Sequence, residues 1–230
     1  MDVSIIGGTG DEGFGLTLRL ARAGYHVTIG SRTAEKGSAV ADTARETLGA
    51  DANVDGASNQ DAATADVVIV TVPFAGQAEI YRSIKDHVRA DAIVVDCTSP
   101  LATAVGGRAW QVVRPWHGSA AEQAKAILEQ EHPVRLVAAF HTISGESLQA
   151  LERDMEGDVL VCGTDPEAKA VVGGLIDRMP NLRWLDAGDL TQARTIEPLT
   201  ALLISVNRIY KIRDAGVRIT GRDAWGVPGS

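Results

Sequence analysis

The sequence predicts an α/β fold of the Rossmann type, a doubly wound, mostly parallel sheet with helices on both faces, followed by a small helical C-terminal part. Three observations predict this class. Strand and helix signals alternate along the chain. A glycine cluster separates the first strand from the first helix. The chain has 230 residues, 45% of them hydrophobic, which is enough for one compact core with a small appendage.

The glycine cluster is the first specific feature. Residues 3–6 are typical of a short buried strand, and the apolar residues from Leu16 onward are typical of a helix. Between them, Gly8, Gly10 and Gly13 form a G-x-G-x-x-G pattern. Such a turn provides a tight bend, a bare backbone and close packing of helix on strand, which a pyrophosphate at a helix N-terminus requires. The turn therefore predicts dinucleotide binding.

The remaining elements follow in the same alternation. We expect strands at residues 25–29, 67–72, 92–96, 135–144, 158–163 and 182–188, and helices at residues 33–48, 76–88, about 121–128 and from 166 onward. The polar residues 51–66 and most of residues 97–121 are expected to be loops. A last long helix is expected from an N-cap at Asp189 toward Ile212, with a break or kink at Pro198. The Gly- and Pro-rich end, residues 221–230, is expected to be loose.

Composition excludes several classes of function. A net charge of -8 argues against nucleic acid as a partner, which normally needs a basic face. No stretch is long enough to cross a membrane, and the chain enters its first strand without a leader, so we expect a cytoplasmic protein. Cys97 and Cys162 are far apart and are expected to be reduced core thiols. The five histidines lack ligand spacing, so no metal is expected.

The end of the second strand indicates which dinucleotide binds. An NAD enzyme usually has an Asp or Glu there, which binds the ribose 2′-hydroxyl. This chain instead has Ser31 and Arg32, with Lys36 one helical turn further on, where the 2′-phosphate of NADP would lie. A solvated basic patch is the alternative, but a helix N-terminus disfavours positive charge. The cluster favours NADP(H), and we assign residues 1–188 as the NADP-binding Rossmann domain.

The chain resembles the NADPH-dependent coenzyme F420 reductases, or F420H2:NADP oxidoreductases, in seven features that occur in the same order: GGTGDEGFGL, the Ser31-Arg32…Lys36 cluster, DVVIVTVPF, AFHTIS, DVLVCG, LDAG and AGVRITG. The resemblance runs from Val3 to about Gly221. It implies a 6-phosphogluconate-dehydrogenase-like Rossmann domain and a direct, reversible hydride transfer between C4 of the nicotinamide and C5 of the deazaflavin. No side chain would be an obligatory nucleophile or base, because the protein stacks the two rings and excludes water.

The same resemblance implies the site residues. It implies contacts to the pyrophosphate, the 2′-phosphate, the ribose and the nicotinamide at Thr9, Gly10, Asp11, Glu12, Ser31, Arg32, Lys36, Val72, Pro73, Ser99, Gly145 and Ala215. The two rings would meet at His141, Thr142 and Ile143. For His141, a role in positioning a ring, a direct acid-base role and a hydrogen-bonded spacer all remain open.

One acid-free stretch suggests a second contact. Between Asp96 and Glu122 this acidic chain has no carboxylate side chain, and it carries Arg108, Arg114 and two tryptophans. Coenzyme F420 has a phosphate and a polyglutamate tail, both anionic. We expect GGRAWQVVRPWHG to form a rim or lid that attracts this tail through Arg108 and Arg114. The alternative is a loop whose tryptophans fill the core.

The apolar last helix predicts association. Its residues Leu199, Leu202, Leu203 and Ile204 offer more hydrophobic surface than one contact with the Rossmann domain needs. We therefore expect a homodimer, with residues 189–230 forming a small helical part that supplies deazaflavin-pocket and dimer contacts.

Two other functions remain open at this point. A related NADPH-dependent reductase could use another acceptor, such as a flavin, a ferric chelate or an imine. The spacing of Gly7, Gly10 and Gly13 also fits short-chain and NmrA-like proteins, some of which sense NADP(H) without catalysis. Tyr81 and Lys85 mimic the catalytic pair of those proteins, but they occur too early in the chain. A sensor would bind the nucleotide tightly and turn nothing over.

Overall fold

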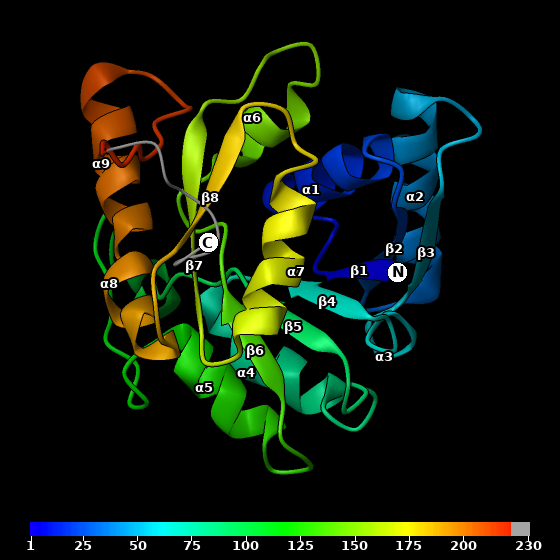
Figure 1. The fold of residues 1–230 in the computed structure, drawn as a ribbon, viewed down its shortest axis with the longest axis horizontal. Coiled ribbons are helices and arrows are strands. Elements are labelled where there is room, and N and C mark those ends of the chain that lie inside the picture. Colours follow the sequence, from blue (N-terminus) through cyan, green and yellow to red (C-terminus); the bar gives the residue numbers. More distant parts are fainter. Residues whose placement is uncertain (222–230) are drawn as a thin grey trace.

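The computed structural model describes residues 1–221, and these contain an eight-stranded sheet between two layers of helices (Figure 1). The strand order is β3-β2-β1-β4-β5-β6-β7-β8. All neighbouring strands pair in parallel except β6 and β7, which are antiparallel. This is the Rossmann-type, mostly parallel sheet that the sequence predicts. The end predicted to be loose lies outside the described residues from position 222 onward.

The elements have the following bounds. The strands are β1 (Asp2–Ile6), β2 (His26–Ser31), β3 (Val54–Ser58), β4 (Val67–Val70), β5 (Ile93–Asp96), β6 (Arg135–Ala138), β7 (Gly157–Gly163) and β8 (Leu182–Asp186). The helices are α1 (Asp11–Arg22), α2 (Ala34–Leu48), α3 (Asn59–Ala62), α4 (Phe74–Ile84), η1 (Ala102–Val105), α5 (Ala120–Leu128), α6 (Gly145–Gln149), α7 (Pro166–Ile176), η2 (Leu190–Gln192), α8 (Ala193–Ile196) and α9 (Leu199–Tyr210).

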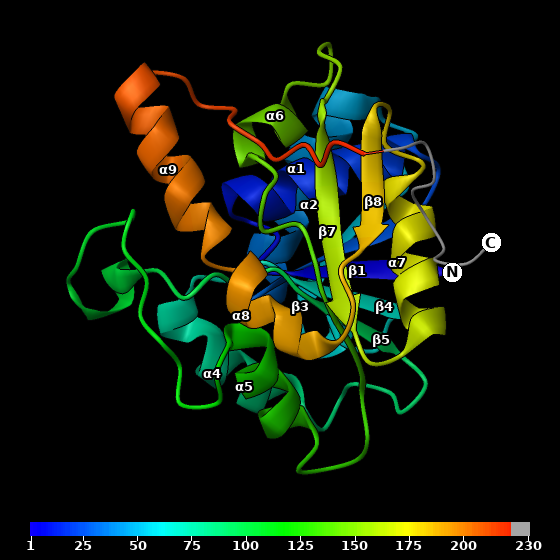
Figure 2. The ribbon, with the colours of Figure 1, turned by 60° about the vertical axis from the view of Figure 1, so that its left-hand side comes forward.

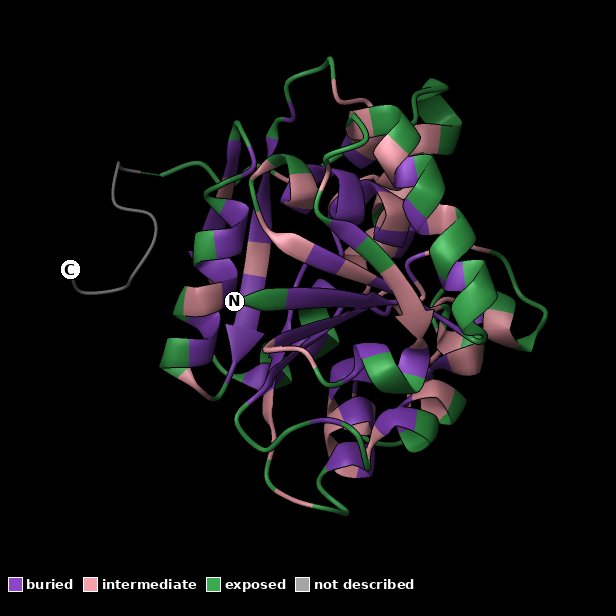
Figure 3. Ribbon diagram, turned by 90° about the vertical axis from the view of Figure 1, so that its right-hand side faces the viewer, coloured by how far each residue is buried: buried purple, intermediate pink, exposed green. Residues whose placement is uncertain are grey.

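The sheet separates two hydrophobic cores. On one face, Val3 and Ile5 of β1 pack in a cluster that includes residues of α1, α6 and α7. On the other face, Ile6 packs in a cluster with residues of α3, α4, α5 and α8. Because both faces are covered, β4 and β5 are buried along their whole length, and β1 is buried after its exposed first residue, as Figure 3 shows. Among residues 1–221, no helix has the length and apolar character needed to span a bilayer.

The predicted last helix is interrupted. The Asp189 side chain accepts a hydrogen bond from the Thr191 N–H (3.1 Å) and caps the short helix η2, not one long helix. Pro198 stands at the N-cap of α9, so the expected break at this proline is confirmed. A proline lacks the N–H that a continuous helix would use, which is why α8 and α9 are separate.

Residues 51–66 are not a loop, as the sequence had led us to expect, because they contain β3 and α3. The edge strand β3 lacks an apolar pattern in the sequence because most of its residues are polar or small. Gly56 explains how the strand forms. A Cβ on Gly56 would lie 2.1 Å from the carbonyl carbon of Gly37 in α2. The helix backbone therefore rests directly on the strand backbone, with two glycines in contact. Such a contact leaves no apolar pattern in the sequence.

The predicted strand at residues 135–144 is also too long. β6 ends at Ala138, because Phe140 adopts a left-handed backbone with φ of 69°. The chain turns there and then forms α6, which the sequence analysis missed. α6 packs on α1 so closely that a Cβ on Gly15 would lie 2.4 Å from Cβ of Leu148.

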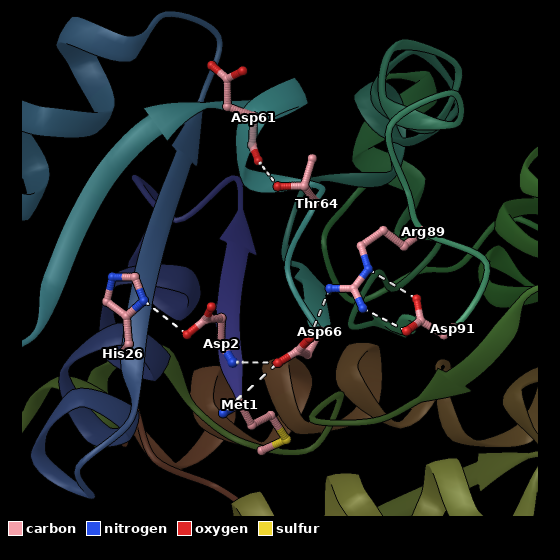
Figure 4. Close-up of polar contacts among 8 residues, drawn as sticks. All are labelled: Met1, Asp2, His26, Asp61, Thr64, Asp66, Arg89 and Asp91. Atoms are coloured by element: carbon pink, nitrogen blue, oxygen red, sulfur yellow. Dashed lines mark hydrogen bonds and ion pairs between the residues drawn. The ribbon is translucent and has the colours of Figure 1, made fainter.

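Polar contacts connect residues at the amino ends of neighbouring strands (Figure 4). The backbone N–H of Asp2 donates to the Asp66 carboxylate (2.9 Å), and Arg89 pairs with Asp66 (3.0 Å) and Asp91 (2.6 Å). His26 contacts Asp2 at 3.2 Å. These groups are partly or largely exposed, so each pair contributes little to stability. They lie at the end of the sheet opposite to the glycine turn.

We predict that Gly56→Ala destabilises the protein by about 1–3 kcal/mol, the usual cost of overpacking a tight contact. Here the added methyl group meets backbone atoms, which cannot move aside as a flexible side chain would. Urea titration followed by circular dichroism measures the change. Gly174→Ala is the matched control, because Gly174 lies in α7 with open space around it. The control should be neutral or stabilising, and equal losses in both variants would contradict the backbone contact.

Candidate active site at the carboxyl edge of the sheet

The glycine turn joins β1 to α1 at the carboxyl ends of β1 and β4. Gly7 has φ of 78°, and a Cβ there would lie 2.6 Å from Cγ1 of Val72. A Cβ on Gly13 would lie 2.5 Å from Oγ1 of Thr71 and 2.7 Å from Cα of Gly8. The glycines therefore let α1 approach the strand ends directly. A bare backbone at a helix start is the kind of turn that binds a pyrophosphate in dinucleotide-binding proteins.

The first turn of α1 contains the predicted pyrophosphate contacts. Gly10 caps the helix with no side-chain hydrogen bond, so backbone N–H groups at the helix start remain for a ligand. Thr9 and Asp11 flank this cap. Glu12 is half-buried, and its burial, together with the nearby Asp96 carboxylate, raises the pKa of Glu12 to about 8. A neutral Glu12 at pH 7 does not repel a phosphate.

The predicted 2′-phosphate residues lie at the neighbouring strand end. Ser31 is the last residue of β2 and is buried, whereas Arg32 and Lys36 are exposed at the start of α2. Thr33 caps this helix by accepting a hydrogen bond from the Lys36 N–H (3.3 Å). Within residues 1–221, neither the Arg32 nor the Lys36 side chain has a carboxylate partner. Their charges remain available to an anion.

Three further predicted residues lie on or next to elements that pack near the turn. Val72 follows β4 and contacts Gly7, and Pro73 is the N-cap of α4. Gly145 begins α6, and a Cβ there would lie 3.0 Å from the backbone nitrogen of Glu12. The structure thus brings Val72 and Gly145, from two separate segments, to the glycine turn and the start of α1.

His141 is a buried residue in the turn that follows β6. It follows Phe140, whose backbone is left-handed, and the residue as a whole is only 5% exposed. Neither ring nitrogen has a hydrogen-bond partner of ordinary geometry in the described part of the chain. Burial lowers the pKa of His141 to about 4, so the imidazole is neutral at pH 7. A buried, unpartnered imidazole is a polar group still to be satisfied.

Asp96 ends β5 close to this imidazole. Its buried carboxylate accepts hydrogen bonds from Gln77 (2.9 Å), the Tyr81 hydroxyl (2.7 Å) and the Thr98 N–H (3.1 Å). Burial raises the pKa of Asp96 to about 6, although these hydrogen bonds oppose the change. Tyr81 therefore has a structural partner, which fits its exclusion as a catalytic residue.

Glu197, between α8 and α9, completes the buried cluster. It accepts hydrogen bonds from the N–H groups of Ala120 (2.8 Å) and Ala121 (2.9 Å) at the start of α5. Burial raises the pKa of Glu197 to about 8 against the effect of these bonds. Donor atoms of Asp96, His141 and Glu197 lie within 4.8 Å of one another, near enough to hold a cation. Because every carboxylate oxygen already accepts a hydrogen bond, we assign Asp96 to fastening α4 to the end of β5 and Glu197 to packing α5.

Thr200 links two of the predicted residues. Its hydroxyl donates to the His141 carbonyl (2.7 Å) and lies 2.6 Å from Oγ of Ser99. The start of α9 is thereby joined to the loop after β5 and to the turn after β6. The sequence analysis missed Thr200, because a single threonine near a helix start has no distinctive spacing.

A cavity of about 890 Å³ adjoins the His141 turn, and Thr142, Ile143 and the segment of residues 211–218 are among the residues that line it. Thr142 is buried and donates to the Asp158 carbonyl (3.0 Å). Ala215 lies in this segment, and its N–H donates to the Asn207 side chain (3.0 Å). Predicted residues of the His141 turn and of the segment of residues 211–218 therefore line one cavity.

The basic loop lies between β5 and α5 and is not bound to the glycine turn by any described contact. Trp116 is 97% exposed, so it does not fill the core. Trp110 is half-buried, with the guanidinium of Arg108 5.4 Å from its ring centroid. Arg114 is exposed. Arg208 of α9 also stacks on Trp110, at 4.2 Å, and was not anticipated from the sequence.

Comparison with known proteins adds independent evidence. Residues 2–100 match the family described as NADP oxidoreductase coenzyme F420-dependent. The chain is 43% identical over 222 residues to the F420-dependent NADP reductase of Methanothermobacter thermautotrophicus, an alignment covering 96% of this chain and 95% of that protein. It is 39% identical to the F420-dependent NADP reductase of Methanocaldococcus jannaschii, covering 96% and 98%.

A solved structure supports the fold. A protein from Arthrobacter sp. FB24 superposes with a TM-score of 0.81, with 24% sequence identity, over 96% of this chain and 100% of that chain. At this identity the likeness shows the fold alone. The fold predicted from the sequence is confirmed at that level.

The raised pKa of Glu12 predicts a pH-dependent stability. The native state holds the Glu12 proton up to about pH 8, whereas the unfolded chain loses it near its ordinary pKa of 4.5. The free energy of unfolding should therefore fall as the pH rises between these values. Glu12→Gln removes this contribution, so its stability relative to wild type should increase from pH 5 to pH 8.

Urea titrations at pH 5, 6.5 and 8 measure this trend. Asp11→Asn is the matched control, since Asp11 is an exposed carboxyl in the same helical turn. A Glu12→Gln difference that stays constant across this range would contradict the account of Glu12.

Proposed function

The chain belongs to the F420-dependent NADP reductase family, and we propose that its glycine turn and its His141 turn hold the two substrates of that reaction side by side. As a member of the family it is an oxidoreductase that uses NADP(H) and coenzyme F420. The observation that carries the proposal is the bare backbone of Gly7, Gly8 and Gly13, where an added Cβ would lie less than 3.0 Å from neighbouring atoms, together with the buried His141 imidazole, which has no hydrogen-bond partner among residues 1–221.

The nucleotide would lie across the carboxyl ends of β1 and β2. The backbone from Thr9 to Glu12 would bind the pyrophosphate at the start of α1, with the N–H groups of Thr9, Asp11 and Glu12 as donors, because the Gly10 N–H already donates to the Gly7 carbonyl (3.1 Å). Arg32 and Lys36 would bind the 2′-phosphate, with the Ser31 hydroxyl beside them. The support is that both cations lack a carboxylate partner among residues 1–221. Val72, Pro73 and Gly145 would then enclose the ribose and the nicotinamide.

The chemistry is supplied by the two bound molecules: a hydride passes from C4 of the reduced nicotinamide to C5 of the deazaflavin, and solvent supplies the proton that completes F420H2. The chain's own task is to stack the rings and exclude water. His141, Thr142 and Ile143 would form the wall where the rings meet. Because His141 is neutral at pH 7, it can donate one ring hydrogen bond and accept another. We assign it to positioning a ring.

Thr200 and Ser99 would hold that wall in place. The Thr200 hydroxyl binds the His141 carbonyl, so a shift of α9 would move the imidazole. This contact links residues 189–230, proposed as the small helical part with the deazaflavin pocket, to residues 1–188, proposed as the NADP-binding domain. The two alternative functions, a reductase with another acceptor and a non-catalytic NADP(H) sensor, are supported only by features that this family also has.

We propose that the protein is a homodimer of the cytoplasm. Of the twelve residues of α9, only Ala201 is buried, and Leu202, Ile209 and Tyr210 are 57%, 63% and 71% exposed. A helix with so much apolar surface needs a partner, and a second copy is the simplest one. The free thiols of Cys97 and Cys162 are both buried, which agrees with a reducing compartment.

The activity is tested by mixing the protein with NADPH and F420 and following the absorbance band of oxidised F420, with NADH and FMN as controls. We expect rapid bleaching with NADPH and much slower bleaching with NADH. Arg32→Ala should raise the KM for NADPH about 10- to 100-fold, because a charge-assisted contact to the 2′-phosphate is lost. The KM for NADH should hardly change. Bleaching with NADH as fast as with NADPH would contradict this use of Arg32.

The dimer is tested by light scattering after size-exclusion chromatography. Leu202→Glu puts a charge on the apolar face of α9 and should shift the protein from dimer to monomer. Exposed Arg178→Glu, after α7, is a charge-changing control that should remain dimeric. A wild-type monomer at micromolar concentration would contradict the proposal.

A further inference from the structure

Two arginines from distant parts of the chain meet on one tryptophan. Arg108 and Trp110 belong to the loop between β5 and α5, and Arg208 lies in the last turn of α9. The guanidinium carbons of Arg108 and Arg208 lie 5.4 Å and 4.2 Å from the centroid of the Trp110 ring. Figure 2 shows this loop and α9 projecting from the same side of the molecule. The contact brings two positive charges to one exposed place.

No acid balances these charges. Within residues 1–221, neither Arg108 nor Arg208 forms an ion pair, whereas Arg194 pairs with Glu122 at 2.6 Å. The loop has no carboxylate between Asp96 and Glu122, and α9 has none along its length. In a chain with a net charge of -8, these two arginines create a local positive charge.

Stacking prepares these arginines for an anion. A guanidinium that lies against an aromatic ring keeps its N–H groups free at its edges. The ring also limits how the side chains move, so less entropy is lost when they bind. Carboxylates and phosphates are the groups that such an edge binds best.

The cluster of Arg108, Trp110 and Arg208 (the arginine–tryptophan trio) also lies at a distance from the proposed active site that can be estimated along α9. α9 starts beside His141, where Thr200 binds the His141 carbonyl. Arg208 is eight residues further along, which corresponds to about 12 Å along the helix axis. A ligand whose ring contacts His141 and whose anionic chain extends beyond a nanometre could therefore reach Arg208. Coenzyme F420 has such a chain, with its phosphate and glutamate residues.

We propose that Arg108, Trp110 and Arg208 form a binding site for the anionic tail of F420, which runs outward along α9. This inference rests on the proposed function, and it adds Arg208 and the Trp110 platform to the loop arginines. Arg114 lies on the same loop without contacting the ring, and contributes long-range attraction. The site selects for deazaflavins that carry the tail.

The test compares two acceptors, F420 with its phosphate and glutamate tail and the tailless deazaflavin alcohol that ends at the ribityl chain. The KM of each is measured with saturating NADPH. Arg108→Ala/Arg208→Ala should raise the KM for F420 about tenfold or more, because two charge-assisted contacts are lost. The KM for the tailless acceptor, the KM for NADPH and kcat should not change. Arg82→Ala/Arg178→Ala is the control with the same change in charge, since both residues are exposed elsewhere.

Salt provides a readout that needs no variant. Raising the NaCl concentration should increase the KM of wild-type protein for F420 and leave that for the tailless acceptor unchanged.

The Arg108→Lys/Arg208→Lys variant keeps the charges but loses the planar stack. Its KM for F420 should lie between those of wild type and the alanine variant.

The outcomes separate this inference from the proposed function. Equal KM changes for both acceptors, or none for either, would overturn the tail site and assign the trio to fastening the loop to α9. Reduction of neither acceptor by wild-type protein would contradict the proposed function itself.

Discussion

The site depends on one close approach, that of α1 to the ends of β1 and β4. Gly13 comes so near to Gly8 and Thr71 that any Cβ would overlap the backbone. This contact aims the first N–H groups of α1 at the carboxyl edge of the sheet, where parallel strands of a doubly wound fold present their ligands. It also determines where Gly145 and the turn of His141 can pack. The predicted nucleotide site and the predicted wall beside the deazaflavin ring therefore both depend on how closely α1 packs against these strand ends.

Electrostatics at this edge follow from what is buried and what is exposed. Asp96 and Glu197 are buried and Glu12 is half-buried, and burial raises the pKa of each of these carboxyl groups, which lowers the negative charge near a phosphate. Arg32 and Lys36 near the start of α2, and Arg108 and Arg208 beside Trp110, lie at the surface without a carboxylate partner among residues 1–221. An acidic protein can in this way present local positive charge to polyanionic substrates.

Features with a local cause were predictable from the sequence, and features made by distant contacts were not. Gly8, Gly10 and Gly13 have a fixed spacing, so the turn and its flanking strand and helix were identified, and Pro198 marked a real break. β3 was missed because Gly56 makes a backbone contact in place of an apolar one. The end of β6 was misplaced because the backbone turn at Phe140 leaves no pattern in a run of small apolar residues. The contacts of Thr200 with His141, and of Arg208 with Trp110, join segments that no motif connects.

The central claim is that the protein brings nicotinamide and deazaflavin into contact, so that hydride passes between them without a carrier on the chain. NADPH deuterated at both hydrogens of nicotinamide C4, mixed with F420 in ordinary water, tests this most directly. Mass spectrometry and proton NMR of the F420H2 product should show one deuterium, bonded to C5, in each molecule formed in a single turnover. Product without deuterium, its label lost to water, would show that the hydrogen passes through an exchangeable group and would contradict direct transfer.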